Sequence, residues 1–123
     1  MLFQNLGLSA LIFTAGTLLG AQMRAAEEVA TKFTIKEVME QGMKGGLLKK
    51  VAAGGATADE SQQLVSLLAA LSANKPPRGD AADWDKRTAA LVTAAKAAAE
   101  GDAEGGAQLT MAAHCGACHR EHK

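Results

Sequence analysis

Apolar side chains between residues 34 and 123 recur at steps of three and four residues, and no stretch of strand length alternates between apolar and polar side chains. This spacing gathers the apolar side chains of a segment on one face of an α-helix. Two capping boxes, Thr34 with Glu37 and Thr57 with Glu60, mark helix starts in the same pattern. The sequence therefore predicts an all-α fold.

The helix boundaries follow from the caps, the glycines and the prolines. Pro76 and Pro77 prevent a helix from continuing through residues 74–80. The predicted helices run from Thr34 to Gly54, from Thr57 to about Ala73, from Asp80 to Gly101, and from about Ala103 to Lys123. Four amphipathic helices joined by short loops favour an antiparallel four-helix bundle.

Three glycines, Gly42, Gly45 and Gly46, lie in the middle of the first predicted helix. Each costs a helix about 1 kcal/mol relative to alanine. A neighbour that must approach the backbone closely would explain them, and a flat ligand is one such neighbour.

The first 23 residues contain no acidic or basic side chain, and an apolar stretch extends from Leu6 to Leu19. This stretch is shorter than the roughly 20 residues that a membrane-spanning helix needs. Small residues predict a signal peptide over residues 1–26, with cleavage after Ala21 or Ala26, and an uncleaved anchor is the alternative. Residues 27–123 then form one soluble domain in an extracytoplasmic space such as the bacterial periplasm, which permits covalent cysteine chemistry.

The chain carries 13 basic and 13 acidic residues, interleaved along its length. A nucleic acid or an anionic membrane surface requires a basic patch, so the composition argues against both as partners. The simplest role of four basic residues is a solvated face, and a docking patch for a redox partner is the alternative: Lys49, Lys50, Lys86 and Arg87.

Both cysteines and all three histidines lie in the last twelve residues, AAHCGACHREHK. Within this cluster, Cys115, Cys118 and His119 form a Cys-x-x-Cys-His motif. One helical turn places both sulfur atoms and the imidazole on the same side. The two thiols can then form thioether bonds with the vinyl groups of one haem while His119 coordinates its iron. The motif predicts a covalently attached haem c.

Three other uses of the two cysteines are less favoured. A thioredoxin-type dithiol follows a strand in a βαβ unit, and no strand is predicted in this chain. A zinc site would require a sharply folded tail to bring His114 or His122 to the cysteines. A disulfide between Cys115 and Cys118 would close too small a loop to stabilise the fold much.

Three segments of the chain resemble the class II c-type cytochromes, which include the cytochrome c′ group and its low-spin relatives. They are KEVM in the first helix, ADWDKRTAAL at the start of the third, and CGACHREHK at the C-terminus, of which only the last is specific. The resemblance implies a four-helix bundle with one haem, His119 as the proximal iron ligand, and Met39 at the distal position. Met43, one turn later, is the alternative distal ligand, and core packing is the ordinary role of helical methionines.

These features predict an exported monohaem cytochrome that carries single electrons between redox proteins. In the family that the chain resembles, a methionine as sixth ligand makes an electron carrier. An unfilled sixth position makes a five-coordinate gas-binding protein, which is the alternative function. No catalytic constellation is recognisable, so neither catalytic residues nor enzyme activity is predicted. The sequence leaves open whether the chain is a monomer or a homodimer.

Two further histidines and the tryptophan have simpler expected roles. His114 and His122 are expected to be solvent-exposed at a helix terminus, where the helix dipole favours a histidine. Trp84 is expected to be a core residue near the haem end of the bundle.

Overall fold

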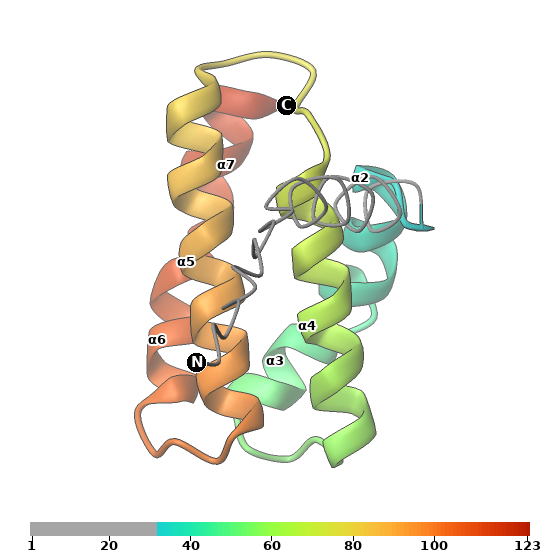
Figure 1. Ribbon diagram of the computed structural model, residues 1–123, viewed down its shortest axis with the longest axis vertical. Coiled ribbons are helices and arrows are strands. Elements are labelled where there is room, and N and C mark those ends of the chain that lie inside the picture. The colour runs from blue at the N-terminus through green and yellow to red at the C-terminus, as the bar shows by residue number, and fades with distance from the viewer. Residues whose placement is uncertain (1–31) are drawn as a thin grey trace, which may run out of the picture.

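Figure 1 shows the computed structural model, which describes residues 32–123. These residues form helices that pack against one another, with no strand among them, so the predicted all-α fold is confirmed. The signal peptide predicted over residues 1–26 lies outside the described residues. Between residues 32 and 123, no helix is both long enough and apolar enough to cross a membrane.

Two long helices, α4 and α5, lie side by side, and the shorter helices pack on them (Figure 1). α6 packs against α5, and the segment that precedes α4 packs against α4. In chain order the helices are α2 (Ile35–Val38), the π-helix η1 (Met39–Lys44), α3 (Leu47–Ala52), α4 (Ala58–Ala73), α5 (Ala81–Ala99), α6 (Gly105–Ala112) and α7 (Cys115–His122).

Both predicted capping boxes are present. The Thr34 hydroxyl accepts a hydrogen bond from the Glu37 backbone N–H at 3.2 Å, and the Glu37 carboxylate accepts one from the Thr34 N–H at 2.7 Å. The same reciprocal bonds join Thr57 and Glu60 at 3.2 and 3.1 Å. Each pair satisfies backbone donors that a helix start leaves free, so α2 and α4 begin where the sequence predicts.

The ends of α5 also agree with the prediction. Asp80 precedes the helix, and its carboxylate accepts a hydrogen bond from the Ala82 N–H at 3.2 Å. After the helix ends at Ala99, Gly101 takes φ = 82°, a left-handed conformation that glycine adopts without a Cβ clash.

The first predicted helix is not continuous, and in this respect the prediction was wrong. Its backbone is α-helical to Val38, π-helical from Met39 to Lys44, and α-helical again from Leu47. Gly46 separates the last two segments with φ = 79°. Because glycines have a low helix propensity, a break at this place costs little.

Gly42 is buried against α4. A Cβ atom at this position would lie 3.8 Å from Leu67 Cδ1 and 3.9 Å from Leu64 Cδ1, which is ordinary van der Waals contact. Leucines of α4 are therefore the close neighbours of this glycine among the described residues.

The fourth predicted helix is also interrupted, so its continuity was wrong. α6 ends at Ala112 and α7 begins at Cys115, because Ala113 (ψ 57°) and His114 (ψ 78°) leave the helical region. The His114 side chain accepts a hydrogen bond from the Ala117 backbone N–H at 3.3 Å and so caps α7. The Cys-x-x-Cys-His motif thus occupies a separate helix of eight residues.

The packed core combines leucines with small residues that allow close backbone approach. A Cβ atom on Gly105 of α6 would lie 2.5 Å from the backbone nitrogen of Ala98 in α5, and one on Gly106 would collide with the carbonyl oxygen of Ala52 in α3. Small residues therefore let α6 approach both neighbours closely. The leucines that are completely buried come from α4 and α6: Leu64, Leu67, Leu68 and Leu109.

Candidate cofactor site at the Cys-x-x-Cys-His helix

The motif forms the first turn of α7. Cys115 is the first residue of the helix and is exposed, whereas Cys118 is half-buried, and both are free thiols. Burial raises the pKa of the Cys118 thiol, and the nearby Arg87 guanidinium partly opposes that shift. The two thiols therefore differ in exposure, and Cys118 is the one that packs against the core.

Two pockets open beside this turn. The larger has a volume of about 350 Å³ and the smaller about 90 Å³, and both are lined by Met39, Leu71, Cys118 and His119. Ligand pockets typically measure about 300–1,000 Å³. Because the two pockets share these lining residues, they are neighbours between η1, α4 and α7, and the two together are called the cavity below.

The remaining walls of the cavity are largely apolar. Ile35 of α2 and Trp84 of α5 line the larger pocket, and Leu91 of α5 lines the smaller. Trp84 is buried, and its indole N–H donates a hydrogen bond to the Asn74 carbonyl oxygen at 2.9 Å. The prediction that Trp84 is a core residue is confirmed, and Trp84 faces the cavity that Cys118 also lines.

The two candidate methionines differ in their relation to the cavity. Both belong to η1 and are half-buried. Met39 lines the larger and the smaller pocket, each together with His119. Met43 lines the smaller pocket and a separate surface groove that also contains Lys49. Met39 is therefore the more central of the two, on a π-helical segment of a kind that often occurs at functional sites.

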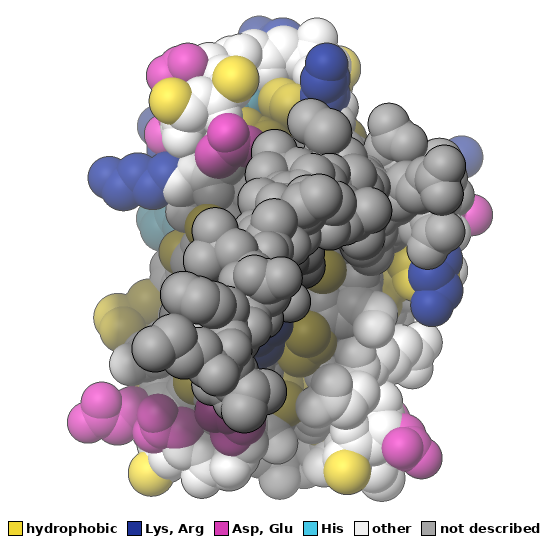
Figure 2. Space-filling model, viewed as in Figure 1, with side chains coloured by type: hydrophobic (Ala, Val, Ile, Leu, Met, Phe, Trp, Pro, Cys, Tyr) yellow, Lys and Arg dark blue, Asp and Glu magenta, His cyan; other side chains and the backbone are white. Residues whose placement is uncertain are grey.

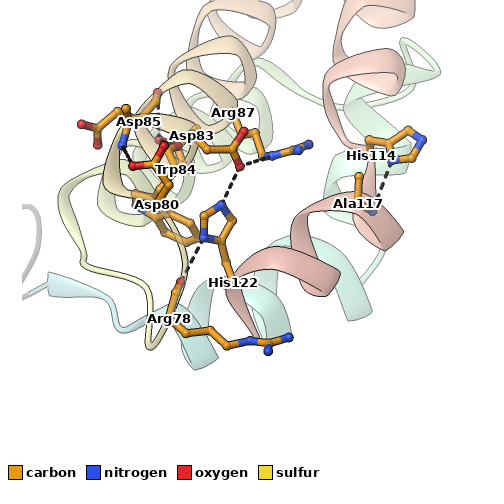
Figure 3. Close-up of polar contacts among 11 residues, drawn as sticks. Arg78, Asp80, Asp83, Trp84, Asp85, Arg87, His114, Ala117 and His122 are labelled. Atoms are coloured by element: carbon orange, nitrogen blue, oxygen red, sulfur yellow. Dashed lines mark hydrogen bonds and ion pairs between the residues drawn. The ribbon is translucent and has the colours of Figure 1, made fainter.

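The two other histidines occupy different environments. His114 is exposed, as expected, at the start of α7. His122 is only 3% exposed, so its predicted exposure was wrong. Its Nδ1 lies 3.1 Å from the Arg78 carbonyl oxygen and its Nε2 lies 2.8 Å from Asp83 Oδ2 (Figure 3). The sequence contains a signal for this burial, because His122 follows Cys118 by four positions and so lies on the same face of the helix as Cys118.

The four basic residues expected on a solvated face do not share one environment. Lys49, Lys50 and Lys86 are exposed, and Lys50 forms a salt bridge with Glu60 of α4 at 2.7 Å. Arg87 is half-buried and lines the smaller pocket. The expectation of a solvated side chain was therefore wrong for Arg87, because its position on α5 faces the cavity.

The side chains around the cavity fit a covalently bound haem. Two free thiols and one imidazole lie on one turn of α7, and a thioether of η1 lines the same cavity. Within residues 32–123, no group of three or more His, Cys, Asp or Glu side chains is arranged to hold a metal ion. Haem iron takes four ligands from the porphyrin, so His119 and Met39 are the side chains here that would hold it from the protein.

Comparisons of the chain with protein-family models, with curated proteins and with solved structures gave no match.

Proposed function

We propose that the protein is an exported monohaem c-type cytochrome that carries single electrons and is built as a four-helix bundle, like the class II cytochromes that it resembles. The observation that carries this proposal is one apolar cavity lined both by the Cys-x-x-Cys-His turn and by Met39. The turn provides the covalent attachment, and the cavity provides the space for the cofactor. In the proposed bundle, α4 and α5 are two of the four helices. The segments 35–52 and 105–122, each of which is interrupted, form the other two.

Each residue of the turn has its own task in this proposal. The Cys115 and Cys118 thiols would hold the haem covalently, each sulfur forming a C–S bond with one vinyl group while the thiol hydrogen passes to the other vinyl carbon. His119 would bind the iron through one imidazole nitrogen. Haem c, when bound, supplies the iron that takes up and releases one electron.

We assign Met39 as the second side chain that would bind the haem iron. It lines both parts of the cavity, whereas Met43 lines only the smaller part. A thioether ligand favours the reduced iron and so raises the reduction potential. Met43 is the alternative ligand, since it lies one turn further along η1.

The apolar walls support the carrier role because they would shield the inner side of the iron from water. Leu71 and Trp84 are nearly inaccessible to solvent, and both line the larger pocket. A dry environment and fixed ligands are the means by which a protein sets a haem potential. Single-electron transfer needs no side chain to move a proton, so we propose a carrier without enzyme activity.

The proposed location and partners follow from the predicted signal peptide in residues 1–26. It would direct the chain to the periplasm or another extracytoplasmic space, where redox proteins would donate and accept the electron. Both acidic and basic side chains are visible on the face drawn in Figure 2. A surface of mixed charge suits docking to another protein better than binding to a nucleic acid.

A five-coordinate gas-binding haem protein is the second candidate. Met39 and Met43 both pack against the buried apolar core as partly buried side chains. If that packing is their whole role, the distal side of the iron is open to small gases.

Production of the full-length chain with the c-type haem maturation machinery tests both candidates. An electron carrier would keep its haem through a denaturing gel, have a low-spin absorption spectrum and not respond to carbon monoxide. A gas-binding protein would also keep its haem but be high-spin, and its spectrum would shift with carbon monoxide. A chain with intact thiols and no covalent haem would exclude both functions, and a Cys115→Ala/Cys118→Ala variant controls for loosely bound haem.

A further inference from the structure

His122, the last residue of α7, is a buried polar side chain to which the electron-carrier proposal gives no task. Its Nδ1 lies 3.1 Å from the carbonyl oxygen of Arg78, in the loop between α4 and α5. Its Nε2 lies 2.8 Å from Oδ2 of Asp83, on α5. Because a carbonyl and a carboxylate are both acceptors, the ring donates from both nitrogens when both bonds are made.

The surroundings of the ring are shaped to receive it (Figure 3). The ring meets the indole of Trp84 edge-on, with the centroids 5.3 Å apart and an interplanar angle of 75°. Asp83 Oδ2 also accepts a hydrogen bond from Arg87 Nε at 2.7 Å, which fixes the carboxylate that faces His122. Gly79 has φ = 95°, and a Cβ atom there would collide with the imidazole. The loop therefore approaches the ring at a position that only glycine can occupy.

α7 has few other attachments to the rest of the protein. Among the described helices, α5 is the one against which α7 packs. The Arg78 guanidinium adds one hydrogen bond, from Nη2 to the Arg120 carbonyl oxygen at 2.7 Å. The backbone leaves helical geometry at Ala113 and His114, so α6 does not impose its direction on α7. His122 thus supplies a buried polar contact between α7 and α5, beside the packing of Cys118 against the core.

We infer that His122 is a positioning residue for the haem site: it holds α7 against α5 and the 74–80 loop, and so sets where Cys118 and His119 meet the cavity. The inference rests on the proposed function. His122 follows these two residues by one helical turn and itself lines the larger pocket, as does its ring partner Trp84. Loss of this link lets α7 tilt, which loosens the iron ligand and admits water to the site.

The test changes one feature of the ring at a time in the full-length protein. His122→Phe keeps an aromatic ring against Trp84 and removes both hydrogen bonds. His122→Gln returns a donor toward Asp83, and His122→Asn returns one toward the Arg78 carbonyl. Arg120→Lys is the control, because it changes an exposed side chain of the same helix and keeps its charge.

Backbone hydrogen exchange in each helix, the haem spin state and the reduction potential are measured for every variant. In His122→Phe, amides of α7 are expected to exchange about tenfold faster or more, the loss expected for a hydrogen bond to a charged group, while α4 and α5 keep their protection. The low-spin signal weakens and the potential falls, because water stabilises the oxidised iron. His122→Gln or His122→Asn restores part of each property, and Arg120→Lys keeps the wild-type exchange in α7, spin state and potential.

Three results would overturn the inference. Unchanged exchange in α7 would show that His122 does not hold the helix. Faster exchange spread evenly over α4, α5 and α7 would make His122 a general core residue. Faster exchange in α7 with an unchanged potential and spin state would separate the contact from the haem site. If the wild-type chain carries no covalent haem, the proposed function and the haem role of His122 both fail, while exchange still decides whether His122 holds α7.

Discussion

The two ends of the molecule are built in different ways on the same pair of long helices (Figure 1). At one end, α6 packs on α3 and α5 so closely that Gly105 and Gly106 have no room for a Cβ atom, and the pocket of about 370 Å³ beside them is lined largely by small residues such as Ala98 and Gly101. At the other end, α2, η1 and α7 lie around two neighbouring pockets of about 350 and 90 Å³ that are lined by larger side chains. The first end is therefore dense in backbone contacts, and the second end is built from large side chains.

This difference shows how a chain poor in aromatic residues can fold and still hold a large ligand. Where α5 meets α6, alanine and glycine let two backbones approach, and small side chains suffice to fill the space. At the cavity, residues such as Trp84, Leu71 and Met39 line a space that no other described side chain fills. The proposed haem would complete the core at that end only, so the two ends should respond differently to substitution.

Removal of both thiols should have the largest effect. The Cys115→Ala/Cys118→Ala variant is expected to lose covalent haem completely and to lose hydrogen-exchange protection in α2, η1 and α7, while α6 stays protected. A haem stain on a denaturing gel and exchange followed by mass spectrometry measure the two effects. Each single variant retains one possible thioether and serves as the control. An equal loss of protection along all helices would show that the ends do not fold independently.

Met39→Ala should have the next largest effect, confined to the cavity. Loss of the thioether ligand is expected to convert the spectrum from low to high spin, to allow carbon monoxide to bind and to lower the potential. Met43→Ala is the control: it should keep the low-spin spectrum and cost less than the roughly 2–5 kcal/mol of a fully buried truncation, since Met43 is half-buried. The reverse pattern would assign the ligand to Met43. A wild-type protein that is already high-spin would favour gas binding.

Gly105→Ala should disturb the dense end. The new methyl group would lie 2.5 Å from the Ala98 nitrogen, so α5 and α6 must move apart, at a cost of about 1–3 kcal/mol in the free energy of unfolding. Gly116→Ala is the matched control, because a Cβ atom there meets nothing within 4 Å, and it should be neutral or stabilising by up to about 1 kcal/mol. Urea titration measures both. A changed haem spectrum in Gly105→Ala would reveal coupling between the ends.

The smallest effect concerns acid stability. The Arg87 guanidinium and then His122 hold the pKa of Asp83 below its ordinary value of 3.8, so the ionised carboxylate favours the folded state above that pH. The contribution is lost as the pH falls through the lower folded-state value. Asp83→Asn should therefore be less stable than wild type at neutral pH and show a flatter decline in Tm below about pH 4. An equally steep decline of Tm below about pH 4 in the variant and the wild type would contradict this.

A second carboxylate gives the control for that experiment. It belongs to Glu60, in the first turn of α4. The Lys50 ammonium lowers the pKa of Glu60. Glu60→Gln should therefore also make Tm decline less steeply below about pH 4. The side chains of both pairs are partly exposed to solvent, so the changes in Tm should be small. Only Asp83→Asn is expected to increase hydrogen exchange in α7, since Asp83 bonds to His122.

The sequence predicted α4 and α5 well because their signals are local. A capping box at Thr57, an N-cap at Asp80 and a glycine at 101 each act within one turn of the backbone. The same reasoning failed for the first and last helices. The π-helical segment after Val38 and the break at Ala113 depend on how the short helices pack against α4 and α5. The periodicity of apolar residues carries no information about that packing.

From the sequence alone one can derive that the described chain is helical, where its long helices begin, and that Cys115, Cys118 and His119 share one turn. Each of these properties depends on residues within a few positions of one another. The tertiary structure decided that Met39 rather than Met43 lines both pockets, and that His122 is buried. These properties depend on segments far apart in the chain, as in the bond from His122 to the Arg78 carbonyl 44 residues away. Burial is set by the packing of such segments, which no local pattern of residues encodes.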